Sequence, residues 1–179
     1  MTHQSKVSKK RAVYDLVDKN DSLVRLGTKK YAKRLGLWRR AVHIFVLNKK
    51  GHLLISKRGP HLFTYPDLFT SSAGGHVERG ESYKNAAQRE LFEELGIKSQ
   101  VKDLGRFDVE DSHGKIIHHL FTAPASRVFP DSREVASCMF FPLPKVLKMI
   151  RSDPKKYTLP FRRAIRYYLQ LEKQRSTLR

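Results

Sequence analysis

The sequence contains a single cysteine, Cys138, which excludes an intramolecular disulfide and any metal cluster built from cysteines. No apolar run approaches the roughly 18–20 residues of a membrane-spanning helix. The first 15 residues also lack the apolar core of a secretory signal. Acidic residues are few, because 17 Asp and Glu stand against 36 Lys and Arg, for a formal net charge of +19. These absences predict a cytoplasmic protein without a membrane span, whose partners carry negative charge.

The positive charge is unevenly distributed along the chain. Residues 145–179 contain eleven basic and two acidic residues, and residues 25–40 contain seven basic and no acidic residues. Nine of the 17 acidic residues instead fall within residues 78–111. Such basic flanks favour polyanions, either phosphorylated small molecules or RNA. No zinc finger, KH loop or RNA-recognition signature is present, so a basic surface that only aids solubility is the simpler alternative.

The length and composition predict one globular domain. The chain has 179 residues, of which 40% are hydrophobic and 30% charged. Residues 1–11 are polar and basic, and we expect them to form a flexible tail. A single domain is then expected over residues 12–179, ending in a basic helix. Because strand and helix patterns are interspersed, the predicted fold class is α/β or α+β.

Local patterns predict the order of the elements. Strands are expected at residues 14–17, 23–26, 40–47, 53–56, 98–109, 116–123 and 136–141. Helices are expected at residues 82–95, 142–150 and 160–173. The first of these helices should end at Gly96. Residues 59–72, rich in proline and aromatic residues, are expected to form a structured loop.

The most informative segment is residues 75–97, with the sequence GHVERGESYKNAAQRELFEELGI. On a helix, Glu90, Glu93 and Glu94 share one face, and like charges at this spacing repel by about 0.2–0.5 kcal/mol per pair. Arg89 can pair with Glu93, but a bound divalent cation would offset the repulsion further. Three carboxylates make an oxygen-only site that suits Mg²⁺ or Mn²⁺ rather than zinc. A solvated acidic face held by arginine pairs is the alternative.

The spacing of the whole segment favours the metal site. It matches the pattern G-x5-E-x7-R-E-U-x-E-E-x-G-U, where U is a bulky aliphatic residue, at every defined position. This pattern is the Nudix box, so the chain resembles the Nudix hydrolases. The flanking segments RAVHIFVLNKKGHLLISKRG and SSAGGHVERGES are similar to the branch related to isopentenyl diphosphate isomerase, which extends the resemblance over about residues 14–170. It implies an α/β/α sandwich on a mixed β-sheet, with the box as a loop–helix–loop.

The resemblance also implies a reaction and a set of metal ligands. Nudix hydrolases cleave a nucleoside diphosphate linked to another moiety, by attack of water on phosphorus, and require a divalent cation. Carried onto this chain, Glu93 and Glu94 are the principal ligands of Mg²⁺ or Mn²⁺, and the Gly75 carbonyl completes the set. Glu90 is expected to be a third ligand, to hold water beside the metal, or to act as the general base.

Further residues are implicated around this centre. Arg89 completes the catalytic set together with Glu81, since hydrogen bonds between them would orient the carboxylates. Arg58 follows the second core strand, and its guanidinium either clamps a distal phosphate or lies on the surface. His76 is expected to touch the cation or to hydrogen-bond within its loop. Glu134 lies where many relatives place a metal-binding or base-like glutamate, which makes it a third substrate-site candidate.

Several side chains leave two interpretations open. His43, in the middle of a strand, is either a metal ligand or a satisfied core or pocket histidine. His118 and His119 either contact substrate or lie in a surface hairpin. Phe63 and Tyr65 either stack on a base or pack beneath their own loop.

The sequence departs from the isomerases at the position of their catalytic cysteine. Gly74 occupies that position, and Cys138 belongs to a different predicted strand, so isomerase activity is not expected. Arg39 and Arg40 stand where a further metal histidine of the isomerase would lie. The sequence therefore predicts a divalent-metal-dependent diphosphate hydrolase with a phosphorylated small molecule as substrate. The alternative is an RNA-directed or non-catalytic Nudix-fold binding module, and homodimers are common in this family.

Overall fold

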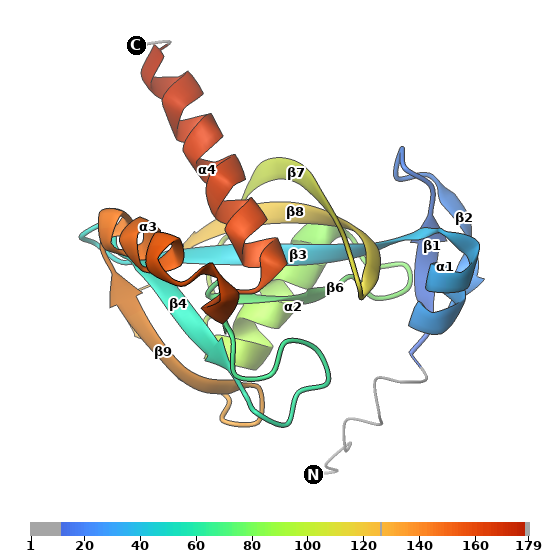
Figure 1. Cartoon of the computed structure of the whole chain (residues 1–179), viewed down its shortest axis with the longest axis horizontal. Coiled ribbons are helices and arrows are strands. Elements are labelled where there is room, and N and C mark those ends of the chain that lie inside the picture. Colours follow the sequence, from blue (N-terminus) through green and yellow to red (C-terminus); the bar gives the residue numbers. More distant parts are fainter. Residues whose placement is uncertain (1–11, 126, 178–179) are drawn as a thin grey trace.

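The computed structural model of the protein describes residues 12–125 and 127–177, so the tail expected at residues 1–11 lies outside the described residues. Its elements run β1 (Tyr14–Val17), β2 (Leu23–Gly27), α1 (Lys29–Leu35), β3 (Trp38–Leu47), β4 (Leu53–Arg58), β5 (Phe69–Thr70), β6 (Ala73–His76), α2 (Tyr83–Leu95), β7 (Lys102–Asp111), β8 (Gly114–Pro124), β9 (Val135–Phe141), α3 (Leu143–Ser152), a 3₁₀ turn (Pro154–Lys156) and α4 (Leu159–Thr177). Figure 1 shows their arrangement.

One mixed sheet carries all the strands, and β3 is its organising element. Along its whole length β3 pairs in parallel with β8, from Trp38 opposite Lys115 to Leu47 opposite Pro124. On its other edge it pairs antiparallel with β6 over residues 41–44, but with β4 only at Leu47 and Leu53. The partner of that edge therefore changes along β3, and β4 diverges from β3 to pair with β9 (Figure 1).

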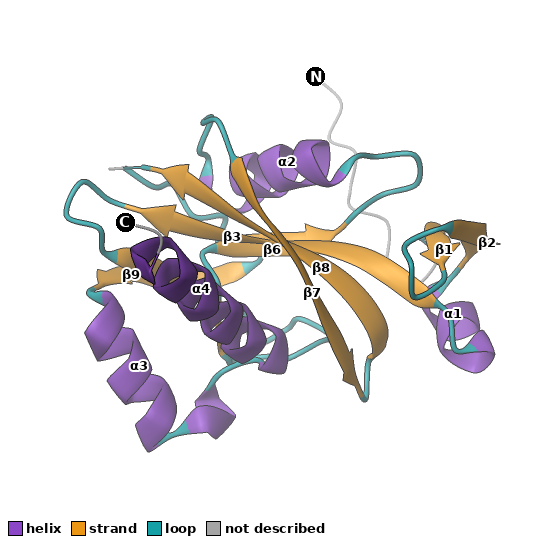
Figure 2. Cartoon of the chain, turned by 90° about the horizontal axis from the view of Figure 1, so that it is seen from above, coloured by secondary structure: helices purple, strands orange, loops and turns teal. Residues whose placement is uncertain are grey.

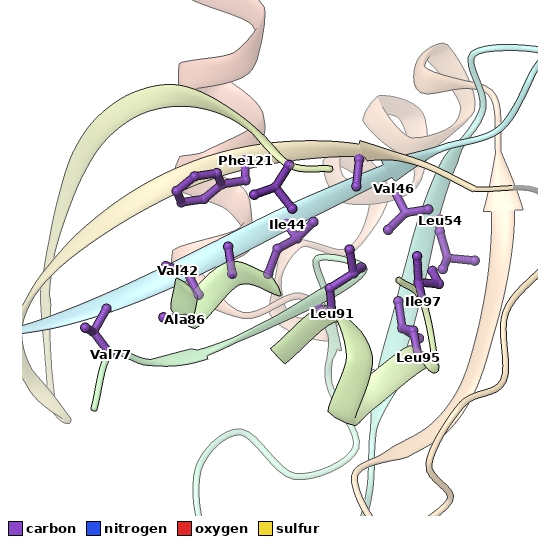
Figure 3. Close-up of a cluster of buried hydrophobic side chains, with 14 residues drawn as sticks. Val42, Ile44, Val46, Leu54, Val77, Ala86, Leu91, Leu95, Ile97 and Phe121 are labelled. Carbon is purple, nitrogen blue, oxygen red and sulfur yellow. The ribbon is translucent and has the colours of Figure 1, made fainter. Parts of the chain in front are cut away.

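Helices cover both faces of the sheet, which confirms the predicted mixed α+β sandwich. Figure 2 shows α2 on one face, and α3 with α4 on the other. The helix α2 packs on one buried cluster, which includes Val42, Ile44 and Phe121 (Figure 3). The helix α4 packs on a second cluster, which includes Phe45 and Leu120. Adjacent residues of β3 thus enter opposite cores, as the alternation of side chains along a strand requires.

The expected helices and most strands are confirmed, and the differences have local causes. The helix α1 was not predicted, because its seven residues, KKYAKRL, bury only Ala32; Thr28 caps its N-terminus through a bond from the Tyr31 amide. The strand β6 was not predicted either, because its sequence is AGGH and glycine disfavours strands. The strand expected at 98–109 begins and ends later, at Lys102–Asp111. Among the described residues, no helix is long and apolar enough to cross a membrane.

The packing of α2 generates a stability prediction. Leu91 is fully buried in the cluster beneath α2, whereas the next residue, Phe92, is half exposed (Figure 3). We expect Leu91→Ala to lower the free energy of unfolding by about 2–5 kcal/mol through lost burial and a residual cavity. Phe92→Ala, on the same helix, should cost less than about 1 kcal/mol. Urea unfolding of both variants checks this, and equal losses would contradict the assigned packing.

Candidate active site

The helix α2 begins and ends where its sequence dictates. The Ser82 side chain accepts a hydrogen bond from the Asn85 amide and caps the N-terminus. Gly96 follows the last turn with φ 65°, in the left-handed conformation that favours glycine. Between these ends, Glu90 and Glu94 face the sheet and are buried, whereas the Glu93 side chain is 37% exposed. The three carboxylates that were predicted to share one helix face therefore differ in how deeply they are buried.

Arg89 holds the acidic side chains around it in place. Its guanidinium donates to both Glu81 carboxylate oxygens at 2.9 Å, and also to Glu90 Oε1 at 2.7 Å. It further donates to the His76 carbonyl oxygen at 3.1 Å, which ties α2 to the end of β6. A longer contact of 3.4 Å reaches Glu93. This geometry agrees with the orienting role expected for Arg89 and Glu81.

The strand β6 lies so close to α2 that its two glycines are sterically required. A Cβ atom on Gly75 would overlap the Glu90 carboxylate, and one on Gly74 would lie 2.5 Å from the Val42 carbonyl oxygen. The Gly74 amide donates to Glu94 Oε2 at 3.3 Å. Bare backbone thus lines one side of the two buried carboxylates, which explains the Gly-Gly pair within β6.

A cavity of about 230 Å³ opens beside these carboxylates. Its wall includes Gly75 and Glu94 from the box, Gly74 just before it, and also the three predicted substrate-site residues Arg58, His76 and Glu134. The structure therefore brings residues from β4, β6, α2 and the segment before β9 to one place. Glu90 stands behind Gly75, and neither Glu90 nor Glu93 belongs to the cavity wall itself.

Opposite charges meet at this end of the cavity. Burial raises the pKa of Glu94 well above its usual range, and the neighbouring Glu90 and Glu134 raise it further. Burial lowers the pKa of Arg58 from its ordinary value, although Glu94 and Glu134 partly oppose that shift. Arg58 donates from Nε to the Thr64 carbonyl oxygen at 2.9 Å, which fixes its guanidinium at the wall. Arg58 is thus a cavity residue rather than a surface one.

The donor set suits a hard divalent cation, although its ligands are not gathered into a finished cluster. Among residues 12–125 and 127–177, no three His, Cys, Asp or Glu side chains stand together in a metal-binding arrangement. The buried Glu94 nevertheless lies among carboxylates that raise its pKa, and the Gly75 backbone lies directly against the Glu90 carboxylate. A cation would relieve that repulsion, and oxygen donors are those that Mg²⁺ and Mn²⁺ prefer. The residues present therefore fit a divalent cation such as Mg²⁺ or Mn²⁺.

The other wall of the cavity carries histidines, and the structure places the side chains whose roles were left open above. His43 is buried, and its Nδ1 lies 2.5 Å from Ser71 Oγ, as expected for a pocket histidine. His118 is also buried and lines the cavity. His119 points to the opposite face of β8, where it stacks on Tyr83 with ring centroids 4.0 Å apart. Tyr65 lines the cavity as well, together with Phe63.

Arg39 is a cavity residue that the sequence interpretation did not assign. It is 2% exposed, and its guanidinium donates to the His113 carbonyl oxygen at 2.8 Å and to His76 Nε2. Arg39, Ala41 and His43 alternate along β3, and all three line the cavity. This alternation could have identified Arg39 from the sequence. The nearly continuous apolar run that follows in β3 made the alternation hard to recognise.

Comparison with known proteins agrees with this geometry. The NUDIX domain family matches residues 37–161. The chain is 30% identical over 159 residues to isopentenyl-diphosphate Delta-isomerase 2 of Photorhabdus laumondii, covering 84% of this chain and 88% of that protein. It is 32% identical over 136 residues to an uncharacterized Nudix hydrolase of Pseudomonas aeruginosa, covering 75% and 79% of the two chains. The fold also matches a crystal structure from Deinococcus radiodurans with a TM-score of 0.69 at 23% identity, covering 79% and 90%.

The Arg89 network generates a second prediction. Arg89→Ala would leave the buried Glu90 carboxylate and the Glu81 carboxylate without their guanidinium, so we expect the free energy of unfolding to fall by about 3–5 kcal/mol. The control is Arg133→Ala, which removes a largely exposed side chain whose guanidinium pairs with Asp131. Thermal and urea unfolding of the two variants provide the measurement. A loss for Arg89→Ala no larger than that for the control would contradict the anchoring role.

Proposed function

The chain belongs to the Nudix hydrolase family, and on that premise we propose that it hydrolyses the diphosphate linkage of a nucleoside diphosphate bonded to another moiety. The observation that carries the proposal is the position of Glu94. It is a buried carboxylate that faces a cavity also lined by Arg58, and it has the glycine backbone of β6 beside it. Carboxylates and a guanidinium at one end of a cavity suit a substrate whose phosphates carry both a cation and negative charge.

We assign the residues as follows. Glu90, Glu93, Glu94 and the Gly75 carbonyl would hold Mg²⁺ or Mn²⁺. When bound, such a cation neutralises charge on the diphosphate and acidifies a water molecule. Arg89 is a positioning residue, because its bonds to Glu81 and Glu90 orient the acidic face.

The remaining cavity residues would bind the substrate, support the cavity wall or accept a proton. Arg58 binds a phosphate of the substrate through its guanidinium. His76 supports that end of the cavity by accepting from Arg39. Glu134 lines the same cavity from outside the box helix. We assign it the role of general base, which accepts a proton from the attacking water. In this arrangement the metal ligands and the proton acceptor come from different segments of the chain.

Isomerase activity is not proposed, although isomerases are among the relatives. Gly74 stands in the cavity wall without a side chain. The single cysteine, Cys138, is absent from that wall and packs against the cluster beneath α2. An allylic proton transfer needs an acid and a base across a carbon skeleton, and this cavity offers no thiol for either role.

The first test is turnover across a panel of nucleotide-linked and isoprenoid diphosphates, with Mg²⁺, Mn²⁺ or a chelator. Wild-type protein should release phosphate or pyrophosphate only with metal. Glu94→Gln should lower kcat/KM by at least about 100-fold, because removing an anionic ligand weakens metal-assisted charge stabilisation by several kcal/mol. The exposed Glu110→Gln is the control. Full activity of Glu94→Gln, or none for folded wild-type protein on any substrate, would overturn the proposal.

A separate measurement tests the metal site through stability. In chelator, Glu94→Gln should be as stable as wild type or more stable, because it removes a buried charge that its neighbours oppose. Added Mg²⁺ should raise the melting temperature of wild type and leave that of Glu94→Gln unchanged. Differential scanning calorimetry compares the four conditions. Equal Mg²⁺ stabilisation of both proteins would place the cation elsewhere.

RNA binding is a second candidate function, favoured by a groove between α3 and α4. The groove has a volume of about 570 Å³, and its lining includes four arginines: Arg151, Arg162, Arg163 and Arg166. The Nε atom of Arg162 is buried and has no hydrogen-bond partner among the described residues. Guanidinium groups on the solvent side of a helix suit phosphate oxygens of a nucleic-acid backbone.

The RNA candidate is tested by salt dependence. The double variant Arg163→Gln/Arg166→Gln should weaken binding of a labelled single-stranded RNA and reduce the slope of log K against log salt by about 1 to 2. Hydrolysis of a small substrate should not change, since neither Arg163 nor Arg166 lines the active-site cavity. An unchanged salt slope would remove this candidate.

A homodimer and a cytoplasmic location stay predictions. Sedimentation would test the first, and cell fractionation the second.

A further inference from the structure

The chain gathers exposed aliphatic side chains near its first two strands. Among the described residues, nine large hydrophobic side chains are exposed, and five of them lie within residues 13–35: Val13, Leu23, Val24, Leu26 and Leu35. The other four come from four separate segments. Three of the five belong to β2, in which every residue except Gly27 is exposed. Single exposed apolar residues are ordinary, whereas such a group indicates a surface for a partner.

The strand β2 forms the outer edge of the sheet. It stands last in the strand order, and its one pairing partner in the described part of the chain is β1. Together with β1 and α1 it lies at the end of the molecule away from α3 (Figure 1 and Figure 2). Alternate backbone N–H and C=O groups of an edge strand point away from the sheet, where a further strand can pair with them.

Positive charge accompanies this edge along the sequence. Residues 22–35 contain five basic residues and no acidic residue. The guanidinium groups of Arg25 in β2 and Arg34 in α1 both lie over the Tyr31 ring, each 4.7 Å from its centroid. One ring therefore holds two cations close together beside the edge, where an incoming carboxylate can meet both.

The acidic residues that precede β2 are already bound within the protein. Asp18 accepts hydrogen bonds from two backbone amides of its own turn, at 2.8 and 2.9 Å. Asp21 accepts from Arg40 Nε at 2.6 Å and from the Tyr83 hydroxyl at 3.0 Å. Asp15 accepts from the Gly80 amide at 3.1 Å. These carboxylates balance groups elsewhere, so the charge at the edge calls for an acidic partner.

A second copy of the chain is a poor occupant of this edge. In an antiparallel pair centred on β2, Arg25 of one copy would oppose Arg25 of the other, and like charges directly opposite are destabilising. The pairing of β2 with β1 is also irregular, since Leu16 faces Arg25 but Val17 faces Leu23. Such bulges hinder the flat association of edges. Residues 1–11 contain four Lys and Arg and no acidic residue, so their charge does not complement the edge either.

The combination of an open edge, aliphatic side chains and basic charge selects an extended segment of protein. The phosphates of RNA would bind the basic groups but leave the aliphatic side chains uncovered. The hydrocarbon of a membrane would cover the aliphatic side chains but offer no partner to the backbone groups of a strand edge. An extended peptide supplies backbone hydrogen bonds, and its alternating side chains can be aliphatic and acidic.

We propose that the outer edge of β2 binds an extended acidic segment of another protein, which adds to the sheet as a further strand. Its carboxylates would lie beside Arg25 and Arg34, and its aliphatic side chains would cover those of β2. No residue of β2 lines the active-site cavity. The interaction is therefore separate from the proposed hydrolysis and does not depend on it.

Peptides of defined sequence test the proposal on the full chain. The probe is a fluorescent seven-residue peptide that alternates glutamate and valine, and its control has lysine in place of glutamate. Fluorescence anisotropy should show saturable binding of the acidic peptide and at least about 10-fold weaker binding of the basic one. Failure of the acidic peptide to bind, or equal binding of both peptides, would overturn the proposal.

Variants locate the binding on β2. Arg25→Glu should weaken binding of the acidic peptide by about 3- to 30-fold, because an attractive cross-strand pair becomes repulsive, and should strengthen binding of the basic one. Lys50→Glu makes the same change of charge in the exposed turn after β3 and should bind like wild type. Leu23→Ser/Leu26→Ser should also weaken binding. Unfolding curves establish that each variant is folded, and equal affinities of Arg25→Glu and Lys50→Glu would contradict the assigned surface.

Backbone pairing separates strand addition from a simple contact between charges. Amide hydrogen exchange of β2 is followed by NMR with and without the acidic peptide. Alternate amides of β2 should become protected when the peptide binds, because only those that point outward gain a partner. Binding without added protection in β2 would mean that the peptide does not join the sheet, and the proposal would fail.

The other possible occupants give different results. Cosedimentation with phosphatidylserine vesicles that Leu23→Ser/Leu26→Ser abolishes, without peptide binding, would assign the surface to a membrane. A concentration-dependent dimer that the same variant dissociates would assign it to a second copy. Either result would overturn the proposal. Hydrolysis should be equal in wild type and all these variants, so the failure of this inference and the failure of the hydrolase proposal are distinguishable.

Discussion

The burial of Glu90 and Glu94 is the constraint on which the rest of the site depends. Ionised carboxylates are costly to remove from water unless other groups compensate their charge. Arg89 does so for Glu90, through a 2.7 Å bond within a network that also holds Glu81. Among the described residues, Glu94 is compensated by a 3.3 Å amide bond from Gly74 and the field of Arg58, against the opposing fields of Glu90 and Glu134. The cation that we propose at Glu94 would offset these opposing fields.

The sheet makes this arrangement possible because β3 separates two environments. Its side chains alternate between the core beneath α2 and the opposite face, where Arg39, Ala41 and His43 meet the cavity. Since β6 replaces β4 on the edge of β3 at these residues, the glycine backbone can approach the carboxylates of α2. The cavity end at which we propose metal binding and the histidine wall are thus consequences of one change of strand partner.

The sequence predicted the box helix and its acidic residues because their signals are local. Ser82, Gly96 and the carboxylate spacing are all contained in one short segment. The strand β6 could not be predicted, because its glycines are required by contact with Glu90 and Val42 rather than by strand propensity. The place of His118 depends on the parallel register that puts it beside Ala41. No local pattern encodes a register between strands so far apart in the chain.

The phosphate recognition proposed for Arg58 and a cation would give affinity but no selectivity. Every diphosphate presents the same oxygens, so the choice among substrates has to come from the rest of the cavity wall. An apolar wall discriminates weakly, because one extra methylene changes binding by only about 1–3 kcal/mol. A buried side chain that needs a partner discriminates more strongly, since the wrong substrate leaves it unpaired. Isomerases are among the relatives of this chain, but the cavity wall has a bare glycine, Gly74, and Cys138 lies outside it, so the chemistry we propose is hydrolysis rather than isomerisation.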